Sequence, residues 1–133
     1  MAYQYSTTVR NAMIDAIEAA TGASPTLELR TGAPPATCAT ADTGTVLATI
    51  ALPADWMTTA AAGAKALSGT WQDAAADATG TFGHFRIKQG ATTHWQGTAS
   101  GPGGGGDIVM DSPTVTVGQQ VNLVTFGLTA GGA

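Results

Sequence analysis

The stretch that decides the fold class is SGPGGGGDIVMDSP, residues 100–113. Gly101, Gly103 and Gly106 follow the spacing G-x-G-x-x-G, which in dinucleotide-binding proteins forms the turn between a strand and a helix. That turn requires a helix directly after it, because the helix N-terminus holds the pyrophosphate. Here the next residues form a short β-type run that Pro113 ends. We therefore predict neither a cofactor site nor a doubly wound sheet.

The segments on either side of the glycines indicate strands. From Leu67 onward the chain consists of short runs rich in Thr, Val and aromatic residues, most of them separated by Gly, Pro, Asp or Ser. Many short strands predict a mainly β fold, as an antiparallel β-sandwich or a small jelly-roll-like barrel. Residues 101–106 are then predicted to be a mobile loop between two antiparallel strands, moving on the nanosecond-to-microsecond scale.

The last apolar run, residues 119–130, is predicted to be one strand with two apolar faces. One face carries Val121, Leu123, Thr125 and Gly127, and the other carries Val124, Phe126 and Leu128. A strand that is apolar on both faces is typical of the centre of a sheet.

The opening segment predicts one helix, residues 6–22. Ser6 or Thr7 can cap its start, Gly22 is suited to its C-terminal end, and Pro25 prevents it from resuming. The helical spacing defines an apolar face of Val9, Met13, Ile17 and Ala20, with Ile14 and Ala16 beside it. We expect Arg10, Asp15 and Glu18 on the opposite, solvated side. The Asp15–Glu18 pair has the spacing of a catalytic pair, but nothing nearby in the sequence supports that role.

A β-rich body, residues 26–133, is predicted to follow the helix within a single domain of residues 1–133. Strands are expected at 27–31 and 45–52, joined by the long loop TGAPPATCATADTG with its Pro34–Pro35 pair. The alanine-rich segment 54–66 predicts a short helix, which Gly63 weakens.

Composition excludes several classes of protein. The chain has 133 residues, of which only 11% are charged, and its net charge is −4. Five dispersed cations form no basic patch, so we expect no nucleic-acid partner. The sequence carries no secretory signal pattern and no apolar run long enough to cross a membrane, so we expect a protein made in the cytoplasm, with no membrane partner. A single cysteine allows no intrachain disulfide.

The histidines are the first candidate ligands. His84 and His94 both lie in predicted strands and could approach one another, with Asp73, Asp77, Asp107 and Cys38 as further ligands. No metal-binding spacing such as H-E-x-x-H or C-x-x-C occurs, so polar positions on half-exposed strands are the favoured interpretation. A small metal-dependent hydrolase stays open as the weakest alternative.

Cysteine and tryptophan supply the remaining candidates. Cys38 lies in a proline-rich loop without an evident base, which favours a small, partly buried residue over a nucleophile. Trp56, Trp71 and Trp95 are expected to pack in the core or an interface, with stacking on sugars as the alternative. We therefore predict no catalytic, cofactor-binding or metal-binding residue and no enzymatic activity.

The sequence resembles a group of small virion proteins of tailed bacteriophages and prophages. The resemblance rests on TGAPPA, ADTGTVLA and GTWQDAAADATGT, together with the amphipathic opening segment and the Thr/Val-rich end. It covers nearly the whole chain. Its motifs are structural, so no catalytic residue is carried over.

The resemblance implies a capsid cement or decoration protein on the exterior of a virion. Its partners would be the major capsid protein and copies of itself, as a dimer or trimer. A tail or neck protein, or a carbohydrate-binding module of a tail spike, is the alternative. The low charge agrees with these interpretations, because such a surface can lie against protein without burying unpaired charges. We expect the opening helix, the Pro34–Pro35 loop and the chain ends to reach neighbouring molecules.

Overall fold

In the computed structural model, which describes residues 3–123 and 126–132, one helix precedes eleven short strands. The mainly β fold with an N-terminal helix is therefore confirmed. The helix is α1 (Thr7–Thr21), and the strands are β1 (Thr26–Arg30), β2 (Val46–Ala51), β3 (Ala64–Ala66), β4 (Trp71–Asp73), β5 (Gly80–Thr81), β6 (His84–Gln89), β7 (Thr92–Ser100), β8 (Ile108–Val109), β9 (Thr114–Val115), β10 (Val121–Leu123) and β11 (Gly127–Thr129).

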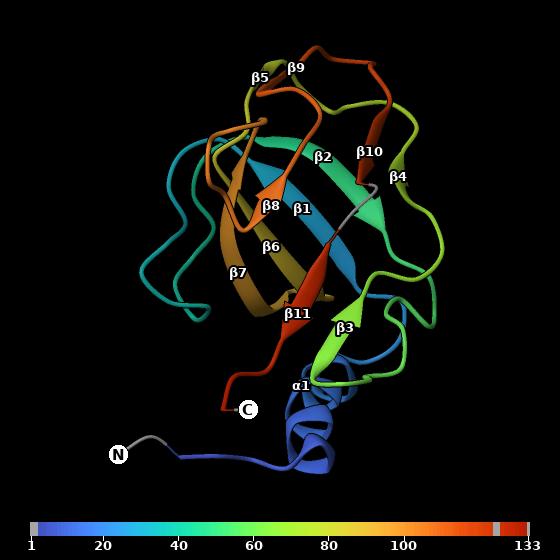
Figure 1. Cartoon of the computed structure of the whole chain (residues 1–133). Coiled ribbons are helices and arrows are strands. Elements are labelled where there is room, and N and C mark those ends of the chain that lie inside the picture. Colours follow the sequence, from blue (N-terminus) through green and yellow to red (C-terminus); the bar gives the residue numbers. More distant parts are fainter. Residues whose placement is uncertain (1–2, 124–125, 133) are drawn as a thin grey trace.

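The largest sheet has five strands in the order β2-β1-β6-β7-β8 and curls into half a barrel (Figure 1). Two-stranded sheets β10-β4, β11-β3 and β5-β9 complete the body, and α1 lies at its lower end (Figure 1). The two-residue period of a strand places Leu27 and Leu29 of β1 on the inner face with Phe85 and Ile87 of β6. The predicted strands at 27–31 and 45–52 are confirmed as β1 and β2.

Aromatic rings fill the inside of the half barrel. Trp56 and Trp71 are buried, and their ring centroids lie 6.0 Å apart. Trp95, which is half-buried, lies 5.4 Å from Phe126 and 5.6 Å from Phe85 by the same measure. Core packing is therefore confirmed for Trp56 and Trp71, and neither ring is exposed enough to stack on a sugar.

Helix α1 forms where the sequence predicts it, and most of its apolar face points away from the body. Ser6 caps the start by accepting a hydrogen bond from the Val9 backbone N–H, and Gly22 ends the helix at φ 90°. Val9 and Met13 face outward, with exposed fractions of 44% and 47%. The inward side is polar apart from Ile14, because the body offers charged and backbone partners there.

The predicted short helix at 54–66 is wrong. Residues 61–64 form a tight hairpin turn in which the backbone N–H groups of Ala61 and Ala64 donate to each other's carbonyls. Ala62 and Gly63 both have positive φ, 52° and 75°, as a type I′ turn requires. The turn leads into β3, so hairpin geometry outweighs the helix propensity of alanine here.

The glycine run joins β7 to β8, which pair in parallel and not in the predicted antiparallel sense. Parallel neighbours usually need a longer connection, and the short return is possible because glycines allow close approach. A Cβ on Gly101 would lie 2.6 Å from the Pro113 backbone N, and one on Gly104 would lie 2.6 Å from the Ser100 Cβ. The predicted mobility of this loop stays a prediction.

The run 119–130 is not one central strand. Among the described residues, β10 pairs only with β4 and β11 only with β3. Val121, Leu123 and Phe126 are all buried, so the buried face changes between 123 and 126. The predicted positions of Val124 and Thr125 lie outside the described residues.

Candidate interaction surface

Four of the five cations are buried and neutralised inside the molecule, a placement that the sequence did not predict. The buried cations are Arg30, Lys65, Arg86 and Lys88. They fall into two clusters, one beneath the 31–45 loop and one beneath helix α1. The fifth, Arg10, donates from Nε and Nη2 to the Ala130 carbonyl oxygen at 3.1 and 3.0 Å.

The first cluster holds the 31–45 loop against the outer face of the large sheet. Asp42 of the loop forms ion pairs with Arg30, Arg86 and Lys88, and Glu28 of β1 pairs with Arg30 and Lys88. The Arg86 Nη2 also donates to the loop carbonyls of residues 37, 38 and 40. The neighbouring cations hold the pKa of Asp42 below its ordinary value, chiefly through its hydrogen bond from Lys88.

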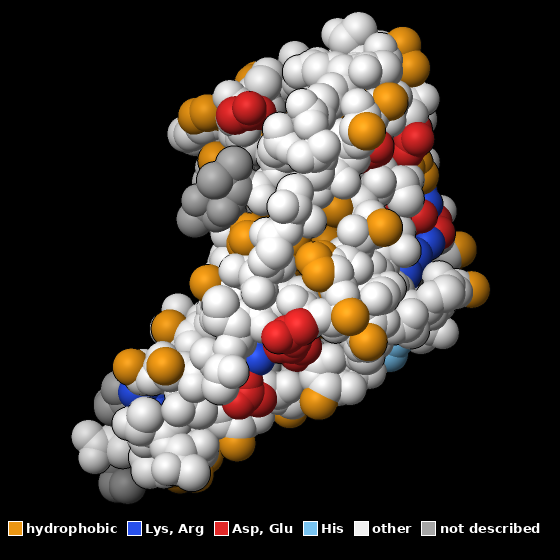
Figure 2. All heavy atoms as spheres, turned by 90° about the vertical axis from the view of Figure 1, so that its right-hand side faces the viewer, with side chains coloured by type: hydrophobic (Ala, Val, Ile, Leu, Met, Phe, Trp, Pro, Cys, Tyr) orange, Lys and Arg blue, Asp and Glu red, His pale blue; other side chains and the backbone are white. Residues whose placement is uncertain are grey.

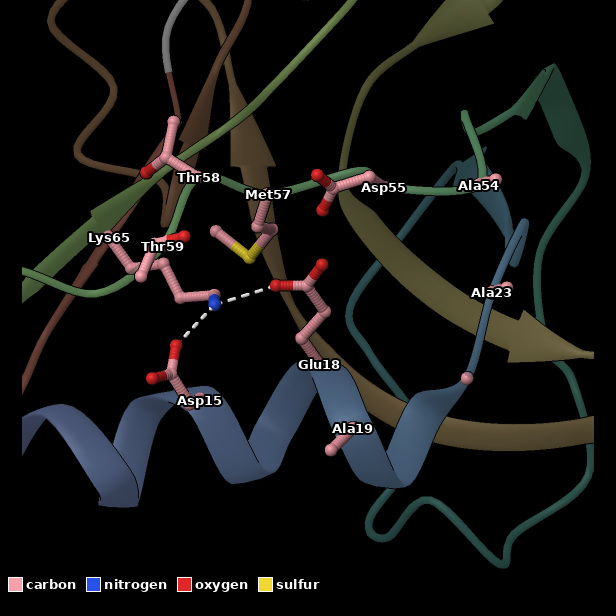
Figure 3. Close-up of a pocket in the computed structure, with 11 residues that line it drawn as sticks. Asp15, Glu18, Ala19, Ala23, Ala54, Asp55, Met57, Thr58, Thr59 and Lys65 are labelled. Atoms are coloured by element: carbon pink, nitrogen blue, oxygen red, sulfur yellow. Dashed lines mark hydrogen bonds and ion pairs between the residues drawn. The ribbon is translucent and has the colours of Figure 1, made fainter.

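Helix α1 is fastened to the body by the second cluster (Figure 3). The Lys65 Nζ of β3 lies 2.6 Å from the Asp15 Oδ1 and 2.6 Å from the Glu18 Oε2. Asp15 and Glu18 are therefore both ion-pair partners of Lys65 and not the solvated pair that the sequence predicts. The hydrogen bond from Lys65 lowers the pKa of Asp15. The pKa of Lys65 is raised, because the two carboxylates outweigh the opposing effect of burial.

A groove of about 490 Å³ runs past this cluster, between α1 and the segment 54–59 (Figure 3). Asp55 lies on its wall, as do the side chains of Thr58 and Thr59. Both Lys65 ion pairs lie in the groove and join α1 to β3. The groove is thus the seam where the helix is attached, and its charged groups act in that attachment.

The outward side of α1 is an apolar surface that is partly open to solvent. It consists of the exposed Val9, Met13 and Ala20 and the partly buried Ile17, the same residues that the sequence pattern groups together. Beside it, a hollow of about 350 Å³ lies between the last turns of α1 and the outward part of β7, at His94 and Trp95. This helix face and its hollow are the candidate interaction surface.

The histidines do not meet, although their strands pair as expected. His84 is buried opposite Thr98, and its Nδ1 lies 2.9 Å from the Gly32 carbonyl oxygen. His94 is exposed near the other end of β7. Within residues 3–123 and 126–132, no three His, Cys, Asp or Glu side chains are placed to share a metal ion. The half-exposed position predicted for His84 is wrong.

The other sequence candidates have structural partners. Asp73 and Asp77 accept hydrogen bonds from Thr49, and Asp107 accepts them from Thr98. Cys38 is partly buried, as predicted, and its carbonyl oxygen accepts from Arg86.

Most of the remaining surface is uncharged. Figure 2 shows one face on which backbone and uncharged polar side chains predominate, with small orange apolar groups and a few charged clusters. Among the described residues, five carboxylates have no cationic partner: those of Asp55, Asp73, Asp77, Asp107 and Asp111. The solvent-exposed charge is therefore mostly negative.

Comparison of the chain with protein-family models, curated protein sequences and solved structures finds no significant match. No helix in the described part of the chain is both long and apolar enough to span a bilayer.

Proposed function

We propose that this chain is a non-enzymatic structural protein of a bacteriophage virion, and that it acts as a cement protein on the head. Its partner is the major capsid protein. The proposal rests on the sequence resemblance and, in the structure, on one observation above all. The apolar face of α1 points away from the body, while the polar side of the helix is fastened to it.

This arrangement suits a protein that adheres to other proteins. A helix normally turns its apolar stripe toward its own core. Here Val9 and Met13 are left for a partner, and burying each of them would contribute about 1–2 kcal/mol. Many identical copies on one lattice add such modest contacts together, so the assembled shell is stabilised by linkage.

The distribution of charge supports the same proposal. Because the buried clusters neutralise most cations, the surface can be covered by a partner without desolvating many basic side chains. A polyanion such as nucleic acid finds no basic patch on the described residues. The partner surface that fits is apolar at its centre, with polar or basic groups around it.

Cosedimentation tests the proposed function. Purified chain is mixed with viral heads and, separately, with tails, and each mixture is sedimented. We expect binding to heads, with a reduction of at least about tenfold in affinity for the double variant V9E/M13E. The matched control V117E alters another exposed apolar residue, which is 60% exposed, and should bind like the unaltered chain.

The alternative location has its own outcome. Binding to tails alone would place the protein in the tail or neck and overturn the cement proposal, while keeping the structural class. Binding to neither particle would overturn both.

A further inference from the structure

Part of the outer edge of β7 has no strand partner among the described residues. In the described residues, β8 covers only Ala99 and Ser100 of that edge, and β6 occupies the other one. The Thr98 backbone N–H points away from β6, because it donates to the Asp107 carboxylate at 2.9 Å. Backbone direction alternates along a strand, so the N–H and C=O of Gln96 point outward on the same edge.

A second open edge belongs to β11. The Phe126 carbonyl accepts from Leu67, and the Ala130 N–H donates to Gly63, so these groups face the β3 hairpin. By the same alternation, the backbone groups of Gly127 and Thr129 point to the opposite side. Within residues 3–123 and 126–132, β11 has no strand partner there.

The two edges border one hollow of about 310 Å³. Gln96 lies on its β7 side and Gly127 on its β11 side, while Phe85, Trp95 and Phe126 give it aromatic walls. The indole Nε1 of Trp95 is buried and has no hydrogen-bond partner in the described structure. The half barrel thus has a gap that offers backbone partners, an aromatic pocket and one unsatisfied donor.

The N-terminal arm, residues 3–6, has the features of a strand that could occupy such a gap. It runs from α1 toward the C-terminal end of the chain (Figure 1), where the Tyr5 N–H donates to the Gly132 carbonyl at 2.6 Å. Tyr3 lies beyond this anchor and is 77% exposed, so its ring does not occupy the hollow of its own chain. A tyrosine combines an aromatic ring with an oxygen that can accept a hydrogen bond.

We propose that the gap between β7 and β11 binds the N-terminal arm of a second copy of this chain, with Tyr3 in the aromatic hollow. The arm adds its backbone to the open edge at Gln96, as in other cases of β-strand addition. The tyrosine hydroxyl supplies an acceptor oxygen to the hollow that contains Trp95 Nε1. The arm is anchored at Gly132, beyond the end of β11, and the gap is bordered by Gly127 of β11, so we infer a mutual exchange of arms between two copies related by a two-fold axis.

The inference concerns contacts between copies and does not depend on a capsid partner. Its test is the mass of the full chain by light scattering over a concentration series. We expect a dimer, and we expect Y3S to raise the dimer dissociation constant about tenfold or more. V117S is the matched control, because it removes another exposed apolar side chain and should leave the dimer unchanged.

Mixing two variants identifies the occupant. G127V places a side chain at the edge of the gap, where a Cβ meets only the Lys65 carbonyl oxygen at 3.1 Å. By itself, Y3S lacks the tyrosine that enters the gap, and G127V lacks an open gap. Together they should form a mixed dimer through the one intact arm and the one intact gap. Thermal melting of G127V checks that this variant folds. If it does not fold, the dimer dissociation constant of Y3S alone tests the proposal.

Three results would overturn the inference. The first is a full chain that stays monomeric at the highest concentration tested. A second is a Y3S variant that dimerises as tightly as the unaltered chain, which would show that another segment or surface makes the contact. The third is a mixture of folded Y3S and G127V that associates no better than either alone.

Discussion

The 31–45 loop and helix α1 are both attached to the β body by ion pairs, but the two sets of ion pairs differ in how many buried cations they contain and in how open their surroundings are. In each, the body supplies cations and the attached segment supplies at least one carboxylate. Asp42 of the loop contacts three cations that are almost fully buried. The helix carboxylates share one buried lysine at the wall of an open groove.

The difference separates a segment that closes the fold from one that presents a surface. Beneath the loop, Arg86 donates to loop carbonyls as well as to Asp42, so loop backbone and sheet form one hydrogen-bonded unit. Helix α1 is held through Lys65 at its polar side and leaves Val9 and Met13 exposed. Pro35 of the loop is buried, while most other loop residues are exposed, so the expected contact of this loop with neighbouring molecules stays a prediction.

The largest effect is expected for R86M. It removes a buried cation and leaves loop carbonyls and Asp42 with fewer partners, so the free energy of unfolding should fall by about 3–5 kcal/mol. Urea denaturation measures the change. R86K, which keeps the charge but lacks the guanidinium fork, should show an intermediate loss. A loss below about 1 kcal/mol for R86M would mean that the loop cluster contributes little.

A smaller effect is expected for K65M. Asp15 and Glu18 keep 44% and 19% of their side chains exposed and can be hydrated when the lysine is removed. We expect a loss of about 2 kcal/mol in the free energy of unfolding, again by urea denaturation. If K65M is as destabilising as R86M, the loop attachment does not contribute more to the free energy of unfolding than the helix attachment does.

Acid should weaken both attachments. The pKa values of Asp42 and Asp15 are lowered from 3.8 in the folded chain. Their contribution to stability is therefore present above that value and is lost as the pH falls through the lower folded-state pKa. D42N should flatten this acid dependence more than D15N does, because Asp42 contacts three cations. The acid dependence is measured as the difference between the urea midpoints at about pH 3 and about pH 7. Equal flattening in D42N and D15N would contradict the larger contribution expected for Asp42.

Base should weaken the helix attachment. The pKa of Lys65 is raised from 10.5, so its contribution is complete below that value and is lost as the pH rises through the folded-state pKa. Urea midpoints of the unaltered chain and K65M should therefore converge at high pH. If the urea midpoints of the two proteins stay equally far apart as the pH rises, the raised pKa of Lys65 is contradicted.

The smallest effect on stability is expected on the outer face of α1. M13A should change the free energy of unfolding by no more than about 0.5 kcal/mol, since that side chain is exposed. The adjacent I14A empties a buried site against Ala60 and Ala130 and should cost about 2 kcal/mol or more. Equal losses in thermal or urea unfolding would mean that the outward face also packs against the protein.

Local signals predicted some elements well. Ser6, Gly22 and Pro25 act on the backbone next to them, which is why α1 begins and ends close to the predicted residues. Alternation in Leu27–Arg30 identifies β1 for the same reason. The candidate surface was half predicted, because the spacing of Val9, Met13, Ile17 and Ala20 identifies an apolar face without saying which way it points.

The turn at Ala62–Gly63 shows why other elements could not be predicted. Alanine favours a helix in isolation, but the contacts of β3 with β11 and of Gly63 with Asn11 fix a hairpin there. The partners of Lys65 were equally hidden, since Asp15 is 50 positions away in the sequence. One sequence signal for such clusters was available: five cations in a chain of 133 residues are few enough to be structural.

By itself, the sequence determined the β-rich class, the N-terminal helix and the absence of a dinucleotide-binding turn at 100–113. These follow from periodicity, caps and the missing helix, all of which act over a few residues. Only the tertiary structure decided that α1 turns its polar side inward and that the glycine run returns the chain parallel to β7. Those outcomes depend on where distant partners such as Lys65 and Pro113 lie, and local sequence carries no information about them.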